Sequence, residues 1–385
     1  MQALVYDKEK QPWATSVGFI KTDIADPVID PEDETDKENV VIRLHYAGVC
    51  GTDRGLWYRQ NFKDAVLNSL TAENKNQRII GHEICGDIVA MGSRVQDKFG
   101  LRIGDFVSAE SHIICSQCYQ CIHGQANVCT NEKIMGVTHD GGFAEYVKLP
   151  TKIIWPTDRS LIRTELACLQ EPFGNAVHAA SKADLRHKNV AIFGCGPIAM
   201  FLIIIAAAKE AKNIIVVEPK EENLIMAKKL GATQTIKLDL KDKEESWQSD
   251  SDVVSTVREL TDGLGADVSF EMAGFNSSVN NALESVRRGG DVVLFGLKGG
   301  DFIIPSFEKL IVKGITQHSV IGRKILTTRL ETKKLFESQE NGVQEKLWQI
   351  ILNKGQGTIL DFNAFDPIIF EEKMAKQAKF IIKFS

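Results

Sequence analysis

NVAIFGCGPIAMFLIIIAAA, residues Asn189–Ala208, governs how the second half of the chain folds. Its apolar run, Val190–Ala208, has a length that could just span a bilayer. Gly194, Gly196 and Pro197 break that run into two pieces. We therefore predict a short buried strand followed by a buried helix, and not a membrane span.

The sequence after this stretch alternates between strand and helix patterns. Strands are expected in NIIVVEP (213–219), GADVSFEMAG (265–274) and GGDVVLFGL (289–297). A helix that ends at Gly231 is expected after the first of them. This order is typical of a parallel, doubly wound α/β sheet. The charged segment Asp239–Asp252 is predicted to be a surface loop.

The turn between the first strand and its helix reads G-x-G-x-x-A, with Gly194, Gly196 and Ala199 at the small positions. The first glycine permits a tight turn, the second lets a pyrophosphate approach the backbone, and the alanine fits where helix meets sheet. Pro197 and Ile198 open the helix, whose N-terminus favours an anion. In this strand–turn–helix context the pattern predicts a dinucleotide site rather than a glycine turn without a cofactor.

An acidic residue, Glu218, ends the next predicted strand. An acid at this place hydrogen-bonds the adenosine ribose hydroxyls and repels a 2′-phosphate, which favours NAD over NADP. Lys220 is close in sequence and leaves NADP as an alternative.

The first half of the chain has a different pattern, in which short apolar runs alternate with glycines and charged turns. Residues 1–20 and 39–49 are predicted as strands, and Cys85–Glu110 as part of a β-barrel-like region. Near the C-terminus a helical segment (324–339) is followed by the strand-like KFIIKF (379–384). The pattern leaves open whether this last strand rejoins the first domain.

Four of the eight cysteines are spaced C-x2-C-x2-C-x7-C. Such clustering is typical of a closed, structural zinc site with four thiolate ligands. A ferredoxin-type iron–sulfur run begins in the same way, but its fourth cysteine comes sooner and precedes proline, whereas Thr130 follows here. Zinc is therefore favoured over an iron–sulfur cluster or four free thiols. The ligands would be Cys115, Cys118, Cys121 and Cys129.

A second set of possible ligands lies in three separate stretches, AGVCGTD, IIGHEICG and LQEPFGN. A catalytic zinc takes mixed Cys, His and carboxylate ligands and keeps one position open. Cys50, His82 and Glu171 could supply three ligands, and Thr52 and Glu83 stand beside two of them. Because these stretches are far apart, spacing alone cannot join them into one site.

The composition is that of a globular protein, with 43% hydrophobic and 25% charged residues. A net charge of −5 argues against a nucleic-acid or anionic-membrane partner. The opening sequence MQALVYDKEKQPW lacks the apolar core of a signal peptide. We therefore expect a cytoplasmic protein whose cysteines are thiols or metal ligands rather than disulfides.

Taken together, these motifs resemble the zinc-dependent medium-chain dehydrogenase/reductase family. The resemblance covers nearly the whole chain and rests on GVCGTD, GHE, the clustered cysteines, GGFAEYV, EPFGNAVHA, the G-x-G-x-x-A turn and GGDVVLFGL. It implies an α/β chain with a GroES-like β-barrel catalytic domain, residues 1–173 and 319–385. A Rossmann NAD-binding domain with a doubly wound parallel sheet would occupy residues 174–318.

The resemblance also implies two zinc ions per chain. The catalytic zinc would be held by Cys50, His82 and Glu171, with Glu83 or water as the fourth ligand, and the structural zinc by the clustered cysteines. The implied reaction transfers a hydride from a secondary alcohol to NAD, with NADP possible. Thr52 would help to pass the hydroxyl proton out.

Within the family, the sequence is most similar to the threonine dehydrogenase subfamily. That similarity makes His112 a substrate-pocket residue and places Arg323 in a cofactor-side motif. Gly55 is a departure, since it stands where the subfamily has a histidine that relays the proton. L-Threonine or a similar amino alcohol is the expected substrate. A sugar or polyol is one alternative, and a nucleotide-binding protein without catalysis is another.

The resemblance further implies a small-molecule alcohol as the partner, with no nucleic acid and no membrane. Relatives commonly form homo-tetramers or homo-dimers by pairing edge strands of their Rossmann sheets. The expected pairing strand here is DVVLFGL (291–297).

Overall fold

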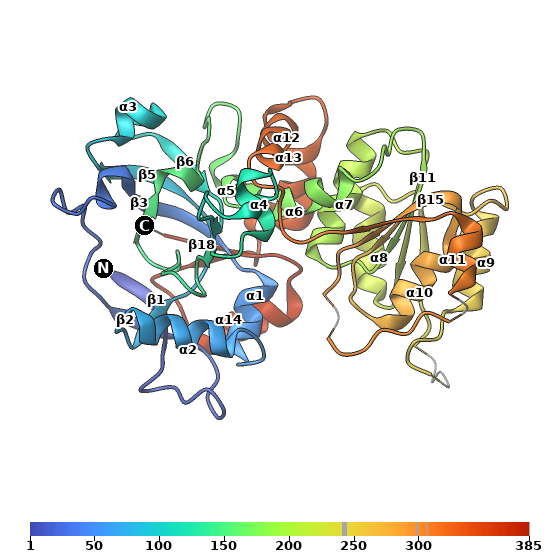
Figure 1. Ribbon diagram of the computed structural model, residues 1–385, viewed down its shortest axis with the longest axis horizontal. Coiled ribbons are helices and arrows are strands. Elements are labelled where there is room, and N and C mark those ends of the chain that lie inside the picture. The colour runs from blue at the N-terminus through green and yellow to red at the C-terminus, as the bar shows by residue number, and fades with distance from the viewer. Residues whose placement is uncertain (241–244, 298, 306, 385) are drawn as a thin grey trace. The chain divides into compact units, whose positions relative to one another are not determined.

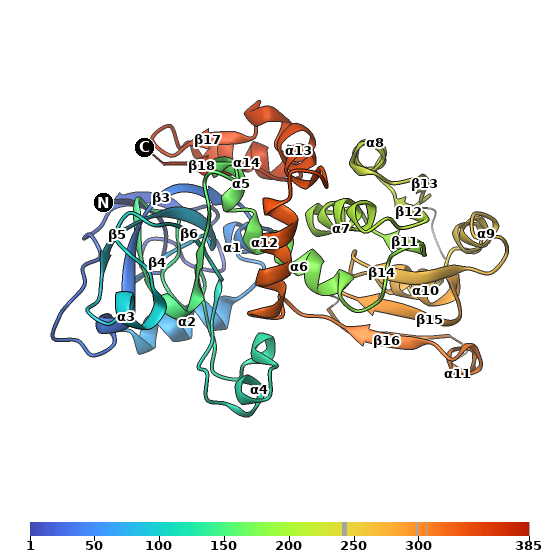
Figure 2. The ribbon, with the colours of Figure 1, turned by 90° about the horizontal axis from the view of Figure 1, so that it is seen from above.

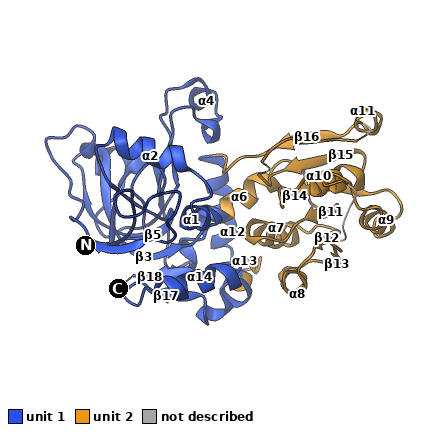
Figure 3. Cartoon of the chain, turned by 90° about the horizontal axis from the view of Figure 1, so that it is seen from below, with its two compact units in different colours: residues 1–172, 325–339, 347–385 blue, residues 173–324, 340–346 orange. Residues whose placement is uncertain are grey.

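The computed structural model describes residues 1–240, 245–297, 299–305 and 307–384, which form two compact units (Figures 1 and 3). Unit 1 comprises residues 1–172, 325–339 and 347–385, and unit 2 comprises residues 173–324 and 340–346. Unit 1 is rich in antiparallel strands, whereas unit 2 contains a parallel sheet with helices. The expected α/β fold class, with a β-barrel-like part and a doubly wound part, is confirmed.

The bounds of these units differ slightly from those of the expected domains, which were residues 1–173 with 319–385 and residues 174–318. Residues 319–324 stay with unit 2 because Val320 continues the sheet, donating its N–H to the Leu294 carbonyl. Residues 340–346 also belong to unit 2, where α13 (Val343–Lys346) packs against α7 (Pro197–Ala208).

The sheet of unit 2 contains six described strands, all parallel, in the order β13-β12-β11-β14-β15-β16. This is the strand order of a dinucleotide-binding Rossmann sheet. The first three strands follow one another from the centre to one edge of the sheet, and the next three from the centre to the other edge. The strands are β11 (Asn189–Phe193), β12 (Asn213–Glu218), β13 (Gln234–Lys237), β14 (Ala266–Glu271), β15 (Val286–Leu294) and β16 (Thr316–Ser319).

Helices cover both faces of this sheet (Figure 2): α7 and α8 lie on one face, and α9 and α10 on the other. The predicted strand and helix of the opening stretch are β11 and α7. Residues Ala199–Ala206 of α7 are all buried. Across the described residues, each helix falls short of the length and apolar character that crossing a membrane requires. The remaining helices of unit 2 are α8 (Glu221–Leu230), α9 (Ser251–Glu259), α10 (Asn276–Ser285) and α11 (Glu308–Lys313).

Unit 1 is built around one long strand, β3, which pairs antiparallel with β5, β9 and β18. The last strand, β18, also pairs parallel with β17, so the KFIIKF segment joins this sheet. Two smaller sheets have the orders β2-β1-β4 and β7-β8. The strands are β1 (Gln2–Asp7), β2 (Ile20–Asp23), β3 (Asn39–Gly48), β4 (Gln77–Ile79), β5 (Glu83–Met91), β6 (Phe106–Ala109), β7 (His112–Ile113), β8 (Lys133–Ile134), β9 (Tyr146–Pro150), β10 (Ile154–Pro156), β17 (Ile359–Asp361) and β18 (Ile381–Lys383).

Helices accompany the strands of unit 1. One of them, α4, lies in a lobe that projects from the rest of the unit (Figures 2 and 3). The helices are α1 (Gly51–Trp57), α2 (Lys63–Ala72), α3 (Val95–Phe99), α4 (Tyr119–Ile122), α5 (Thr164–Ala167), α12 (Thr327–Glu337) and α14 (Pro367–Lys376), and α6 (Gln170–Ala180) begins at the end of this unit.

Three sequence-based expectations are corrected. Residues 1–20 do not form continuous strand, because β1 ends at Asp7 and turns follow. Residues 291–294 of the segment DVVLFGL belong to β15, which lies between β14 and β16, so the edge strands of the described sheet are β13 and β16. Of the expected loop 239–252, residues 241–244 lie outside the described residues, and Ser251 already begins α9, capped by the Asp250 side chain.

An aromatic cluster forms part of the core of unit 1. Phe370 on α14 stacks on Trp57 with ring centroids 5.0 Å apart, and Phe19 and Phe380 pack edge-on nearby. Trp57 is 2% exposed, so it packs in the core. The cluster ties the residues after Cys50 to a helix near the C-terminus.

Phe370→Ala should lower the free energy of unfolding by about 3–5 kcal/mol, since the buried ring leaves a cavity among aromatic neighbours. Ile368→Ala on the same helix is the matched control. Its side chain is 70% exposed, so its effect should stay within about 0.5 kcal/mol. Urea unfolding followed by tryptophan fluorescence measures both, and equal effects would contradict the assignment of Phe370 to the core.

Candidate active site and metal centres

Three candidate ligands meet where β3 and β5 run side by side. Gly48 on β3 pairs with Glu83 on β5, which brings Cys50 close to His82 and Glu83. Their ligand atoms lie within 4.8 Å of one another. His82 and Glu83 are buried and Cys50 is half-buried. A thiolate, an imidazole and a carboxylate at such separations fit a divalent metal such as zinc.

The buried polar atoms of this cluster support the fit. Among the described residues, Nδ1 of His82, Oδ1 of Asp53 and Oε1 of Glu83 form no hydrogen bond. His82 Nδ1 lies 3.7 Å from Asp53 Oδ1, too far for a normal hydrogen bond. Buried polar atoms without partners destabilise a fold. A cation coordinated in this cluster would offset that cost.

The electrostatics of the cluster point the same way. Burial lowers the pKa of His82, but the charges of Asp53 and Cys50 outweigh it and raise the pKa to about 10. Burial raises the pKa of Asp53 to about 6, against the attraction of His82. The surroundings of the imidazole therefore favour a positive charge. A divalent ion would supply that charge while a neutral His82 acts as its ligand.

Thr52 and Glu171 flank this tight group. Cys50 is the N-cap of α1, and Thr52 Oγ1 lies 3.9 Å from Cys50 Sγ. Glu171 is buried in the first turn of α6, and its charge interacts with His82. Its carboxylate does not belong to the group whose ligand atoms lie within 4.8 Å, in which Glu83 is the acid.

The sequence patterns assigned no role to two charged residues of the site. Asp53 accepts the backbone N–H of Cys50 at 2.8 Å, and its position three residues after the N-cap is a capping signal that could have revealed it. Lys379 forms a buried ion pair with Glu83. No local signal marks Lys379, because 296 residues separate it from its partner.

The clustered cysteines form a second site, in the projecting lobe around α4 (Figure 2). Their four sulfur atoms lie within 4.8 Å of one another. The Sγ of Cys129 is 3.5 Å from that of Cys115 and 3.8 Å from that of Cys118. A tetrahedral zinc ion with Zn–S bonds of about 2.3 Å separates its sulfur ligands by about 3.8 Å. The cluster has the dimensions of a zinc site with four cysteine ligands.

The thiols of this cluster differ in acidity. The backbone N–H of Cys121 lowers the pKa of Cys118 to about 5, and backbone N–H groups also lower the pKa of Cys115. Burial raises the pKa of Cys121 to about 12, together with its sulfur neighbours. Thiolates this close repel one another, so a shared cation is needed before all four can ionise.

His112 lies at the base of the same lobe, where β7 pairs with β8. Its Nδ1 lies 2.6 Å from Oε2 of Glu132, and its side chain is 21% exposed. The carboxylate fixes the orientation of the ring. His112 is not a member of the tight group of Cys50, His82 and Glu83.

The glycine-rich turn of unit 2 has the geometry that its spacing predicts. Gly194 has φ +95°, and a Cβ there would lie 2.8 Å from the Cβ of Ala273. Gly196 is the N-cap of α7, and a Cβ there would meet no atom within 4 Å. The open space over Gly196 leaves room for a pyrophosphate at the start of the helix. Ala199 is buried inside α7.

Glu218 lies at the end of β12, beside this turn. Its carboxylate accepts the Cys195 N–H at 2.8 Å and the Lys220 N–H at 3.2 Å. These bonds hold the acid against the turn. Elsewhere in unit 2, Arg323 is buried and donates to the side chain of Asn175 at 3.1 Å.

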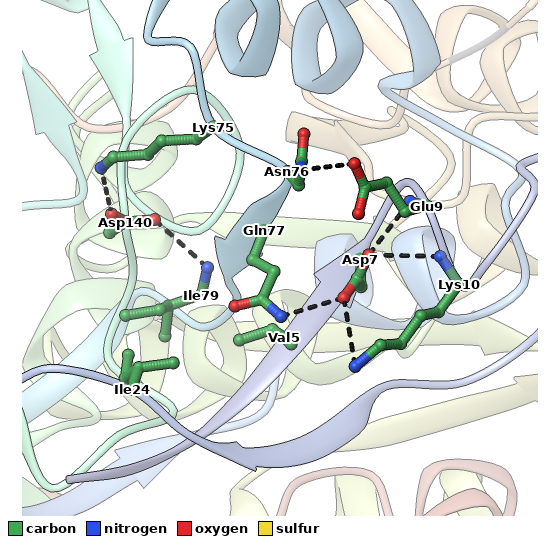
Figure 4. A pocket seen from close by; sticks show the side chains of 10 residues that line it. All are labelled: Val5, Asp7, Glu9, Lys10, Ile24, Lys75, Asn76, Gln77, Ile79 and Asp140. Atoms are coloured by element: carbon green, nitrogen blue, oxygen red, sulfur yellow. Dashed lines mark hydrogen bonds and ion pairs between the residues drawn. The ribbon is translucent and has the colours of Figure 1, made fainter.

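A separate surface pocket of about 450 Å³ lies in unit 1 and contains none of the candidate site residues (Figure 4). Its carboxylates already have partners: Asp7 accepts from Gln77, and Asp140 from Lys75. Nothing in this pocket calls for a ligand.

Two family models match the chain. "Alcohol dehydrogenase GroES-like domain" matches residues 36–159, and "Zinc-binding dehydrogenase" matches residues 197–337. An L-threonine 3-dehydrogenase of Caldanaerobacter subterraneus subsp. tengcongensis is 33% identical over 91% of this chain and 92% of its own length. An L-threonine 3-dehydrogenase of Pyrococcus horikoshii is 36% identical over 78% of this chain and 80% of its own.

Solved structures share the fold. An alcohol dehydrogenase from Thermus sp. ATN1 is 22% identical, with a TM-score of 0.80 over 100% of both chains. Galactitol-1-phosphate dehydrogenase from Escherichia coli is 23% identical, with a TM-score of 0.77 over 100% of both chains.

Cys121→Ser should lower the zinc content from about two ions to about one per chain, because a serine hydroxyl cannot replace a thiolate in a site built from four cysteines. Metal analysis after gel filtration measures the content. Asn131→Ala, an exposed residue of the same lobe, is the control and should keep both ions. Retention of both ions in Cys121→Ser would refute the assignment.

Proposed function

Because the chain belongs to the zinc-binding alcohol dehydrogenase family, we propose that it oxidises the secondary alcohol of L-threonine or a similar amino alcohol with NAD. Family membership makes it an oxidoreductase of CH–OH groups. This argues against the alternative hypothesis of a nucleotide-binding protein without catalysis. The observation that carries the substrate is the 33–36% identity to proteins named L-threonine 3-dehydrogenase over most of the chain.

The catalytic metal would be held by Cys50 and His82, with Glu171 and Glu83 as the available acids. When bound, zinc supplies Lewis-acid chemistry that lowers the pKa of the substrate hydroxyl, and NAD supplies the hydride acceptor. Asp53 fixes the start of α1 through the Cys50 N–H and faces the ring of His82. These contacts orient both ligands before substrate arrives.

A proton must leave the substrate hydroxyl during oxidation. Thr52 is half-buried, and its hydroxyl lies beside Cys50, so we assign it the first step of the path. Gly55 offers no side chain for the next step, and the exposed Asn61 lies against it, with Nδ2 2.7 Å from the place of a Cβ. Solvent water is therefore proposed to complete the path. His112, held by Glu132, is proposed to contact substrate.

The cofactor is proposed to bind along Gly194, Gly196 and the first residues of α7, Pro197 and Ile198. Glu218 would orient the adenosine ribose and select NAD over NADP. Arg323, in unit 2, is proposed to be a further cofactor-binding residue.

We also propose a homo-dimer or homo-tetramer and a cytoplasmic location. The described edge strand β16 offers unpaired backbone groups to a second copy. None of the eight cysteines, all of which lie in described residues, forms a disulfide, which suits a reducing compartment.

The substrate assignment is tested by NADH formation with the zinc-loaded protein on L-threonine, L-serine, 2,3-butanediol, D-glucose and D-sorbitol. L-Threonine should exceed the polyols in kcat/KM by about tenfold or more, because a pocket that hydrogen-bonds the amino and carboxylate groups of an amino acid discriminates against substrates that lack them. Cys50→Ser, which lacks a metal ligand, should be inactive and serves as the control. A preference for glucose or sorbitol would contradict the hypothesis of an amino-alcohol substrate and support that of a sugar or polyol substrate.

Glu218→Ala should weaken NAD binding and reduce the preference for NAD over NADP by about tenfold, since it removes both the ribose acceptor and the repulsion of a 2′-phosphate. Glu222→Ala removes an exposed acid from the first turn of α8 and is the matched control. Dissociation constants of NAD and NADP, measured by fluorescence quenching, test this change in preference. An unchanged preference in Glu218→Ala would mean that another residue reads the ribose.

A further inference from the structure

A fully buried acid lies at the carboxyl end of a central strand of unit 2. Glu271 is the last residue of β14 and is 0% exposed. Its Oε1 accepts the backbone N–H groups of Ala273 at 2.9 Å and Gly274 at 2.8 Å. Burial raises the pKa of this carboxyl group, and hydrogen bonds from Ser278 and from backbone N–H groups oppose the shift only in part. Because burying an acid in this way is costly, its position calls for an explanation.

The place of Glu271 in the sheet is significant. β11 and β14 are the neighbouring central strands from which the chain proceeds first to one edge and then to the other (Figure 2). In open α/β sheets, ligands bind outside the carboxyl ends of the strands at this topological switch point. Phe193, the last residue of β11, pairs with Glu271, and the glycine turn follows Phe193 directly. The buried acid therefore lies at the switch point, beside the glycine turn.

Glu271 connects the segments that leave the carboxyl ends of these strands. Its side chain holds the loop after β14, residues 272–275, through the two N–H groups described above. Its backbone carbonyl accepts the N–H groups of Phe295 at 3.0 Å and Gly296 at 3.1 Å, in the loop after β15. Met272 donates its N–H to the Phe193 carbonyl at 2.9 Å, which ties the loop after β14 to β11. One residue thus joins both loops to the strand that carries the glycine turn.

The packing between these segments leaves no room for displacement. A Cβ at Gly296 would lie 2.2 Å from the backbone N of Gly274 and 2.5 Å from Oε2 of Glu271. A Cβ at Gly194, in the glycine turn, would lie 2.8 Å from the Cβ of Ala273. A shift of the Glu271 carboxyl group would therefore move both loops against the glycine turn.

The part of the cofactor that these loops border follows from the rest of the site. The pyrophosphate is proposed to bind at Gly196 and the adenosine ribose at Glu218, which ends β12. Since β12 lies on one side of β11 and β14 on the other, the nicotinamide half would extend over the carboxyl ends of β14 and β15. Phe275 and Leu297, one in each loop, are 68% and 82% exposed, so apolar surface is available there to an aromatic ring.

We propose that Glu271 is a positioning residue for the nicotinamide half of the cofactor, because its buried carboxyl group holds the loops after β14 and β15 in place beside the glycine turn. The proposal rests on the proposed function, since it requires NAD to bind along this turn. Glu271 acts through the backbone of the two loops and does not itself contact the cofactor.

The experiment measures the binding of two ligands to the full-length protein. NADH, titrated by fluorescence, reports on the whole cofactor, and ADP, titrated by calorimetry, reports on the half without nicotinamide. The variants are Glu271→Ala and Glu271→Gln. Asp267→Ala is the matched control, because Asp267 lies near the amino end of the same strand, where it accepts the Asn189 N–H at 2.8 Å and pairs with Arg287.

Glu271→Ala should weaken NADH binding by about tenfold, because the loops must then be ordered on binding, and should change ADP binding by less than about twofold. Glu271→Gln should bind NADH as the parent does, since its amide oxygen still accepts both N–H groups. Asp267→Ala should lower thermal stability and bind both ligands as the parent does. A purely structural role of Glu271 would leave the ratio of NADH to ADP affinity unchanged in Glu271→Ala, and that result would overturn the proposal.

A second variant covers the case in which Glu271→Ala does not fold. Gly296→Ala keeps the acid but adds a Cβ that meets Oε2 of Glu271 and the backbone N of Gly274. It should show the same selective loss of NADH affinity, and an unchanged ratio of the two affinities would again overturn the proposal.

The failure of this proposal can be distinguished from that of the proposed function. A parent protein that binds no NADH would overturn both. If the parent binds NADH and ADP but oxidises none of the alcohols tested, only the proposed activity fails, and the two titrations still decide the role of Glu271.

Discussion

The antiparallel pairing of β3 with β5 is the contact on which the candidate metal site of unit 1 depends. It sets Gly48 opposite Glu83, and so brings Cys50 together with His82 and Glu83. The same strand, β3, also pairs with β9 and β18, which adds Lys379 to the site. A shift of one residue in this register would turn every side chain to the opposite face of the sheet and dissolve the cluster.

Charge balance is the second constraint on this site. The thiol of Cys50 and the carboxyl groups of Asp53, Glu83 and Glu171 are gathered in a buried region, where uncompensated negative charge is costly. Lys379 compensates part of it within the chain. A divalent metal would compensate the remainder, which explains why a site with so many acids is compatible with a stable fold.

The sequence predicted the strand–turn–helix unit with its glycine turn because this unit is local. Residues 189–208 contain the strand, the turn and the helix, and Gly194 meets the constraint of a positive φ that few other residues tolerate. Misses occurred where the pattern was ambiguous. The family resemblance suggested DVVLFGL as the edge strand that pairs subunits, yet only the order of strands in the sheet decides which strand has an unpaired side.

The sequence by itself determined the lobe of four cysteines, since ligands separated by two to seven residues can reach one ion with little help from the rest of the fold. It also determined the glycine turn, for the same reason. The tertiary structure alone decided which acid joins Cys50 and His82 and that Lys379 neutralises it. These groups come from distant segments, and only the pairing of β3 with β5 and β18 brings them within contact distance.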